Sequence, residues 1–117
     1  PMTYPVPQQC LVEGQSLNLD KELSLDIFAC PGHSPGSVLL LLKDGAKNIA
    51  LFTGDVVFQD SIGRTDLPGG SAEEMAASLA KLKELGQRRN FPPNLPILSG
   101  HGPDTTWAEL LGMNPWL

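Results

Sequence analysis

The segment LFTGDVVFQDSIGRTDLPGGSAEEM, residues 51–75, decides the fold, because it passes from strand to loop to helix. Residues 49–53 are a short apolar run that predicts a buried strand. The polar loop that follows, residues 55–70, has a length that is usually functional or disordered inside a compact domain. Ser71 and Glu74 then form an S-x-x-E capping box, which predicts that a helix begins here.

Downstream of the loop, the sequence predicts a helix, a short strand and a second helix. The first helix closes with the basic residues 88–89 and ends before the proline-rich segment 92–96. Residues 97–99 read as a short strand, and Thr106 with Glu109 forms a second capping box that opens a terminal helix. The apolar face of the first helix is expected to carry Met75, Leu79, Leu82 and Leu85.

Upstream of the loop, the sequence predicts strands only. Residues 17–19 and 23–28 alternate apolar and polar side chains, whereas residues 37–43 form a continuous apolar run that suits a strand covered on both faces. Asp44-Gly45 predicts a hairpin turn, with a loop longer than the tightest type. The order of elements predicts an α/β fold, α+β by segregation, with one mixed, mostly antiparallel sheet and helices on one face.

Composition excludes several classes of function. At 117 residues the chain has the size of one domain, and its net charge of −5 argues against a nucleic-acid or anionic-membrane partner. No apolar run approaches the roughly 20 residues of a membrane-spanning helix. Cys10 and Cys30 are too few for a disulfide framework and indicate a reducing, cytoplasmic location, with Cys30 as a small buried apolar residue.

Three polar residues follow predicted strands and lie among glycines, where loops can converge on one site. They are His33 in CPGHSPG, Asp55 directly after Gly54, and His101 in SGHGP. Taken singly, each histidine is explained by a loop hydrogen bond, Asp55 by an Asx-turn, and residues 64–66 by a solvated loop. Their coincidence favours a metal site, because imidazole and carboxylate together suit Zn²⁺, Fe²⁺ or Mn²⁺.

Three motifs in order carry a resemblance to a known family. The stretches PGHSPGS, LFTGDVVFQDSIGRTDLPGGS and SGHGPDTTWAELLGMNPWL resemble the metallo-β-lactamase-fold hydrolases, in particular the short glyoxalase II-like (hydroxyacylglutathione hydrolase-like) branch. By this resemblance, His33 would be a metal ligand, Asp55 the carboxylate that bridges two metals, and His101 the last ligand of the second metal. A loop formed by Gly54, Arg64, Thr65 and Asp66 would support the site without binding metal.

The family signature H-x-H-x-D-H, which supplies most of the metal ligands, has no counterpart here, since no histidine precedes His33. Residues 1–117 therefore resemble a single partial domain, the C-terminal half of the family's αββα sandwich. Three ligands remain for two ions, whereas a structural zinc takes four protein ligands and a catalytic zinc about three plus water. We expect that the isolated chain neither binds two metals tightly nor hydrolyses substrate efficiently.

The resemblance implies a parent enzyme that uses two zinc ions to hydrolyse thioesters or similar small acyl substrates, with iron as a possible replacement for zinc. In this half of the domain, it implies no catalytic side chain beyond the metal ligands. Two alternatives stay open. In a persulfide dioxygenase-like enzyme, one iron would use His33 and Asp55 but not His101. In a non-catalytic half-domain, the partner would be the missing N-terminal half or a second copy in a homodimer, because a half-sandwich leaves an apolar sheet face uncovered.

Overall fold

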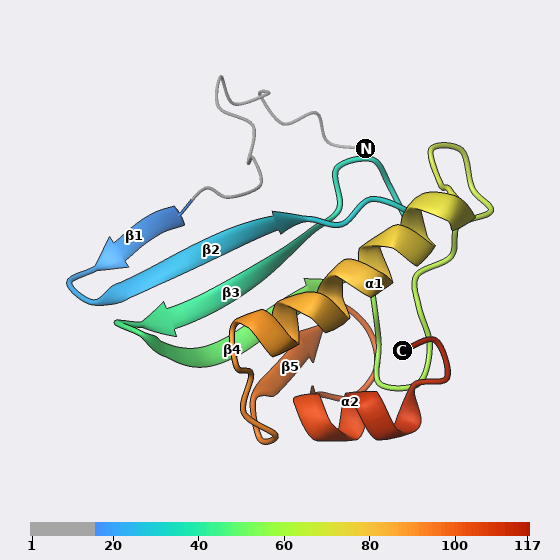
Figure 1. The fold of residues 1–117 in the computed structure, drawn as a ribbon. Helices are drawn as coiled ribbons and strands as arrows, with labels where there is room; N and C mark the ends of the chain where they lie inside the picture. The colour runs from blue at the N-terminus through green and yellow to red at the C-terminus, as the bar shows by residue number, and fades with distance from the viewer. Residues whose placement is uncertain (1–15) are drawn as a thin grey trace.

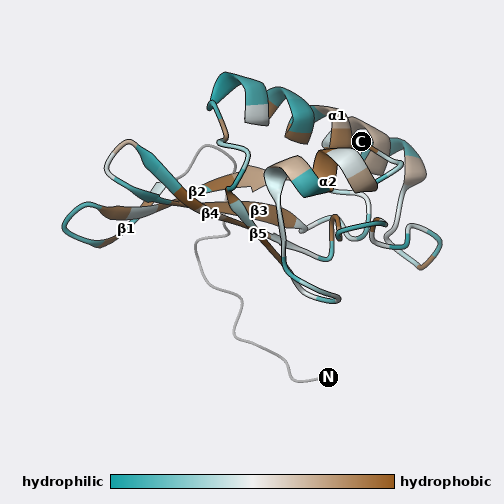
Figure 2. Ribbon diagram, turned by 90° about the horizontal axis from the view of Figure 1, so that it is seen from below, coloured by the Kyte–Doolittle hydropathy of each residue, from teal (hydrophilic) through white to brown (hydrophobic). Residues whose placement is uncertain are grey.

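The computed structural model describes residues 16–117, and these residues form a six-stranded sheet with two helices on one of its faces (Figures 1 and 2). The sheet order follows the chain order. Neighbouring strands are antiparallel except β4 and β5, which are parallel because α1 forms the crossover between them. The elements are β1 (Ser16–Asp20), β2 (Leu23–Ala29), β3 (Val38–Asp44), β4 (Lys47–Gly54), α1 (Ala72–Arg88), β5 (Pro96–Ser99), β6 (Thr105–Thr106) and α2 (Trp107–Met113).

The core lies between the sheet and the two helices. On the sheet side, Leu41 of β3 pairs with Leu51 of β4, which in turn pairs with Ile97 of β5, and at most 1% of each is exposed. Burying each such side chain contributes about 1.5–3 kcal/mol relative to leaving it in water. The four residues predicted for the apolar face of α1 are all buried against this surface: Met75, Leu79, Leu82 and Leu85.

Both predicted helix starts are confirmed, with the cap hydroxyl of each box in place, but the Ser71 N–H donates to the Gly32 carbonyl at 2.7 Å and not to Glu74. The Ser71 hydroxyl accepts a hydrogen bond from the Glu74 backbone N–H at 3.1 Å, and α1 begins at the next residue. Thr106 does the same for Glu109 at 3.3 Å. These hydroxyls partner backbone donors that the helix itself leaves unsatisfied, which fixes where each helix begins.

Three details of the sheet differ from the sequence prediction. The β3–β4 hairpin is tight, because Asp44 pairs with Lys47 and only two residues, the first being Gly45 at φ +60°, form the turn. Strand β3 is fully buried on the helix side only; Leu40 and Leu42 are half-buried on the opposite face, over which neither α1 nor α2 lies (Figure 2). The two-residue strand β6 was not predicted, since it is too short for periodicity.

An ionic cluster fastens the end of α1 to the sheet. Asp26 of β2 is 8% exposed and accepts from Lys43 at 3.1 Å and from Arg89 at 2.9 Å, and the Arg89 guanidinium also lies over the Phe28 ring. Burial works to raise the pKa of the Asp26 carboxyl, but hydrogen bonds from Ser16, Arg89 and Lys43 outweigh it and the pKa is lowered. Asp26 is therefore held in its charged form.

Candidate metal centre

The topology brings the three predicted metal ligands to one edge of the sheet. Strands β2 and β4 run in the same direction because both are antiparallel to β3, and β5 is parallel to β4. Their carboxyl ends therefore meet at the same edge, where loops project the residues that follow them. His33 comes after β2, Asp55 directly after β4, and His101 shortly after β5.

The Asp55 carboxylate lies between the two histidines, with one oxygen toward each. Its Oδ1 is 2.9 Å from Nδ1 of His101, and its Oδ2 is 3.8 Å from Nε2 of His33. The three side chains line an open cavity of about 390 Å³, together with Phe58, Ile62, Gly63 and Arg64. Asp55 thus occupies the central position of the cluster.

The orientation of the His33 ring is fixed by the loop that the sequence marked as site-supporting. Nδ1 of His33 lies 2.9 Å from the backbone carbonyl oxygen of Arg64. Because a carbonyl can only accept, Nδ1 donates its proton; in the neutral imidazole, Nε2 is then the nitrogen with a free lone pair, on the side that faces Asp55. A metal-bound histidine typically donates the N–H of its other ring nitrogen in this way, so this arrangement is one in which His33 could bind a metal through Nε2.

Two glycines allow the chain to approach Asp55 closely, Gly63 at its backbone and Gly100 at its carboxylate. A Cβ atom at Gly63 would lie 1.9 Å from the Asp55 carbonyl oxygen and 3.1 Å from Cβ of His33. A Cβ at Gly100 would lie 2.9 Å from Oδ1 of Asp55. Gly54, predicted to support the site, has φ +52° and accepts a hydrogen bond from the Gly100 N–H at 2.8 Å. The cluster therefore depends on backbone that side chains would displace.

The side chains of the predicted support loop point elsewhere. Arg64 donates to Asp66 through two hydrogen bonds of 2.8 and 3.0 Å, and both side chains are more than 60% exposed. This pairing raises the pKa of Arg64 and lowers that of Asp66. Thr65 lines a neighbouring cavity instead. Contact with the predicted ligands is thus made by the Arg64 backbone, not by the charged groups of the loop.

Sequence reasoning missed one side chain that touches the cluster. The Phe58 ring meets the His101 ring edge to face, with centroids 5.9 Å apart and planes at 89°. No pattern in the sequence pointed to it, because a single aromatic residue in a loop has no periodicity.

The donors fit a metal centre in kind but not in number. Two imidazoles and a carboxylate suit zinc or iron. Within residues 16–117, however, no group of three or more His, Cys, Asp or Glu side chains forms a set that could hold a metal ion. His33 and His101 lie on opposite sides of Asp55, so each side offers one nitrogen and one oxygen. Further ligands are needed to complete either side.

Comparison with known proteins decides the family. The family model described as the metallo-beta-lactamase superfamily matches residues 6–101. The chain belongs to the metallo-beta-lactamase superfamily. This confirms the family expected from the three motifs, and the mixed sheet with helices on one face agrees with it.

Relatives of this superfamily member include named hydrolases. The probable metallo-hydrolase YqgX of Bacillus subtilis is 42% identical over 113 residues, covering 95% of this chain and 49% of that protein. Hydroxyacylglutathione hydrolase GloC of Haemophilus influenzae is 39% identical over 106 residues, covering 90% and 45%. The crystal structure of TTHA1623 in a di-iron-bound form has a TM-score of 0.71 and 37% identity, covering 97% and 50%. The chain spans about half the length of the curated relatives it matches.

No helix in residues 16–117 is long and apolar enough to cross a membrane.

Proposed function

We propose that this chain supplies one half of the two-ion centre of a metal-dependent hydrolase, glyoxalase II-like, that acts on thioesters or similar small acyl substrates. The observation that carries the proposal is the position of Asp55, whose two carboxylate oxygens face different histidines. A carboxylate placed in this way suits a bridge between two ions. The similarity to a hydroxyacylglutathione hydrolase and to a metallo-hydrolase supports the reaction type.

The chain's own residues would hold and shape such a centre. When bound, two metal ions would supply a water of lowered pKa for attack on the thioester carbonyl. Arg64 holds the His33 ring so that Nε2 can bind, and Phe58 packs against the His101 ring. No Ser or Cys nucleophile is needed; Cys30 is fully buried, and burial raises the pKa of its thiol to about 11, so it is unsuited to that role.

The remaining ligands would come from the N-terminal half of the domain; in the isolated chain a second copy would cover the sheet in place of that half without completing the metal centre. The sheet face opposite the helices suits such a partner, because it carries the half-buried apolar side chains Leu40, Leu42, Phe52 and Leu98. Light scattering at micromolar concentration tests this point. We expect a dimer or larger species for the isolated chain, whereas a stable monomer would argue against an apolar contact on this face.

The identity of the metal separates the proposed hydrolase from the alternative. We propose two zinc ions; the di-iron form of TTHA1623 supports iron as the other candidate. A persulfide dioxygenase-like enzyme would hold a single iron through His33 and Asp55, without His101. Metal analysis of the complete protein carrying His101→Ala distinguishes the two. Loss of one of two ions supports the hydrolase, whereas an unchanged single iron supports the dioxygenase.

Activity provides the second test. The complete protein is expected to hydrolyse S-lactoylglutathione or another thioester, and Asp55→Asn is expected to abolish this activity. A complete, metal-loaded protein that cleaves no thioester would overturn the proposed substrate class but not the metal centre.

A further inference from the structure

The C-terminal end of the chain reaches back to the hairpin beside the candidate metal centre. This site hairpin, residues 56–63, is closed by the Val57–Ile62 bridge and by a hydrogen bond from the Gly63 N–H to the Val56 carbonyl at 3.0 Å. Asn114, the residue that ends α2, is 3% exposed. Its Nδ2 donates to the Phe58 carbonyl at 2.8 Å and to the Ser61 carbonyl at 2.9 Å. One side chain therefore joins both sides of the hairpin turn.

The three hydrogen bonds of Asn114 require an amide. The two hairpin carbonyls can only accept, so the amide must turn its NH₂ group toward them. On the other side, the Trp116 backbone N–H donates to Oδ1 of Asn114 at 2.8 Å. An aspartate of the same shape would keep the Trp116 bond but place an acceptor against two carbonyls. The amide is buried, and both its NH₂ group and its oxygen take part in these hydrogen bonds. Its loss would leave the Phe58 and Ser61 carbonyls and the Trp116 N–H without this partner.

The site hairpin is the element that touches both candidate histidine ligands. Near its tip, the Phe58 ring packs edge to face with His101. At its end, a Cβ on Gly63 would clash with the Asp55 backbone carbonyl and would lie 3.1 Å from Cβ of His33. The next residue, Arg64, accepts the His33 hydrogen bond. A shift of this hairpin would move the neighbours of both rings at once.

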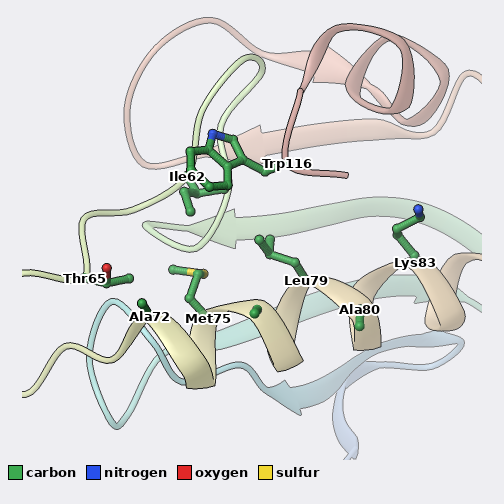
Figure 3. A pocket seen from close by; sticks show the side chains of 9 residues that line it. Ile62, Thr65, Ala72, Met75, Leu79, Ala80, Lys83 and Trp116 are labelled. Atoms are coloured by element: carbon green, nitrogen blue, oxygen red, sulfur yellow. The ribbon is translucent and has the colours of Figure 1, made fainter.

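We infer that Asn114 is a positioning residue of the metal centre. By fixing the hairpin turn it holds Phe58 against His101, and through the same hairpin it supports the His33 contact. The bond to Trp116 adds a second connection, because Trp116 and Ile62 of the hairpin line one apolar cavity over α1 (Figure 3). This inference rests on the proposed function in one respect: the two rings that the hairpin positions, His33 and His101, are the metal ligands proposed above.

The test uses the proton NMR signals of the imidazole rings in the 117-residue chain, which contains two histidines. A His33→Gln variant assigns the two sets of signals. All spectra are recorded at one fixed pH and temperature, so that signal positions are compared under the same conditions. Phe58→Leu removes the neighbouring ring and shows where the His101 signals move without it. Asn114→Ala and Asn114→Asp then remove the two hydrogen bonds that Asn114 donates to the hairpin. Only the Asp variant also adds a negative charge.

In both Asn114 variants the His101 signals are expected to move toward their Phe58→Leu positions, while Asn94→Asp, the same change at an exposed site, leaves them in place. His101 signals that stay at wild-type positions in folded Asn114 variants would overturn the inference, as would a Phe58→Leu variant without any shift. Should Asn114→Ala fail to fold, Asn114→Ser, which keeps one donor, is expected to give a smaller shift in the same direction; no shift would overturn the inference.

A second readout uses the complete protein and does not depend on hydrolysis. Asn114→Asp is expected to weaken zinc binding by about tenfold, the lower end for residues that orient metal ligands. Unchanged zinc affinity, with the ring signals also unchanged, would show that Asn114 serves stability alone. If the complete protein binds zinc but cleaves no thioester, the proposed function fails while this inference stands on the ring signals.

Discussion

Asp55 and His101, 46 positions apart in the sequence, meet at 2.9 Å between Oδ1 and Nδ1, while the second Asp55 oxygen faces His33. In the proposed centre, this carboxylate would belong to two half-formed sites and complete neither. This geometry explains why the side chains of residues 16–117 suit a metal centre in kind but contain no complete set of ligands. It also places the largest expected effects on Asp55 and on the glycines around it.

Replacing Asp55 by Asn in the complete protein is expected to remove both metal ions, because the bridging position needs a charged carboxylate with two oxygens. Elemental analysis after gel filtration measures the metal content. Asp60→Asn, which removes an equal charge from the exposed tip of the site hairpin, is the matched control and should leave the metal content unchanged. Retention of both ions by the Asp55 variant would contradict the bridging role.

Gly63→Ala is expected to destabilise the chain by about 1–3 kcal/mol, as for overpacking of a close contact. The added Cβ would lie 1.9 Å from the Asp55 carbonyl oxygen, so the hairpin must move. Urea unfolding of the two proteins measures the difference. Gly36→Ala is the control, because nothing lies within 4 Å of its Cβ, and it should change stability by less than about 0.5 kcal/mol. Equal losses of stability in Gly63→Ala and Gly36→Ala would show that the contact between Gly63 and the Asp55 backbone can relax without cost.

Cys30 is expected to be inert toward thiol reagents at pH 8 in the folded chain, with Cys10 replaced by Ser so that one thiol remains. The side chain is fully buried and its pKa is raised to about 11, so very little thiolate exists and none is accessible. Mass spectrometry after alkylation should show labelling only in urea. Because the folded pKa is raised, this group's contribution to stability is present below about pH 8.5 and is lost as the pH rises toward 11.

The Asp26 cluster predicts a loss of stability in acid. Because the pKa of Asp26 is lowered in the folded chain, its contribution is present above the unfolded value near pH 4 and is lost as pH falls through the folded value. Asp26→Asn should cost about 1–3 kcal/mol at pH 7, since two charge-assisted hydrogen bonds are weakened. The difference in urea midpoint from wild type should shrink below about pH 4. A difference that is constant with pH would rule out a charge effect.

Much of the fold followed from local patterns. The apolar stripe from Met75 to Leu85 and the serine cap at Ser71 define α1, because the helix period and an N-terminal hydroxyl are both visible in sequence. The tight β3–β4 turn was missed, since the polar pair Lys47-Asn48 looked like loop, although it extends strand β4. There the pairing partner, and not the local composition, decides the structure.

The candidate site was predictable only in part. His33, Asp55 and His101 could be found because histidines and acids that follow strands among glycines are uncommon side chains in a recognisable place. The Arg64 carbonyl could not be found, since every residue has one. Asn114 gave no signal either; its role depends on the return of α2 to the site hairpin, which is a tertiary relationship.

If the metal centre is shared between two halves of the domain, the isolated chain and the complete protein must differ in metal stoichiometry. Both are equilibrated with zinc, freed of excess metal, and analysed for ions per chain. We expect the isolated 117-residue chain to retain no tightly bound ion and the complete protein to retain two. Two tightly bound ions on the isolated chain, or no metal in the complete protein, would contradict the proposal that His33, Asp55 and His101 are half of a shared centre.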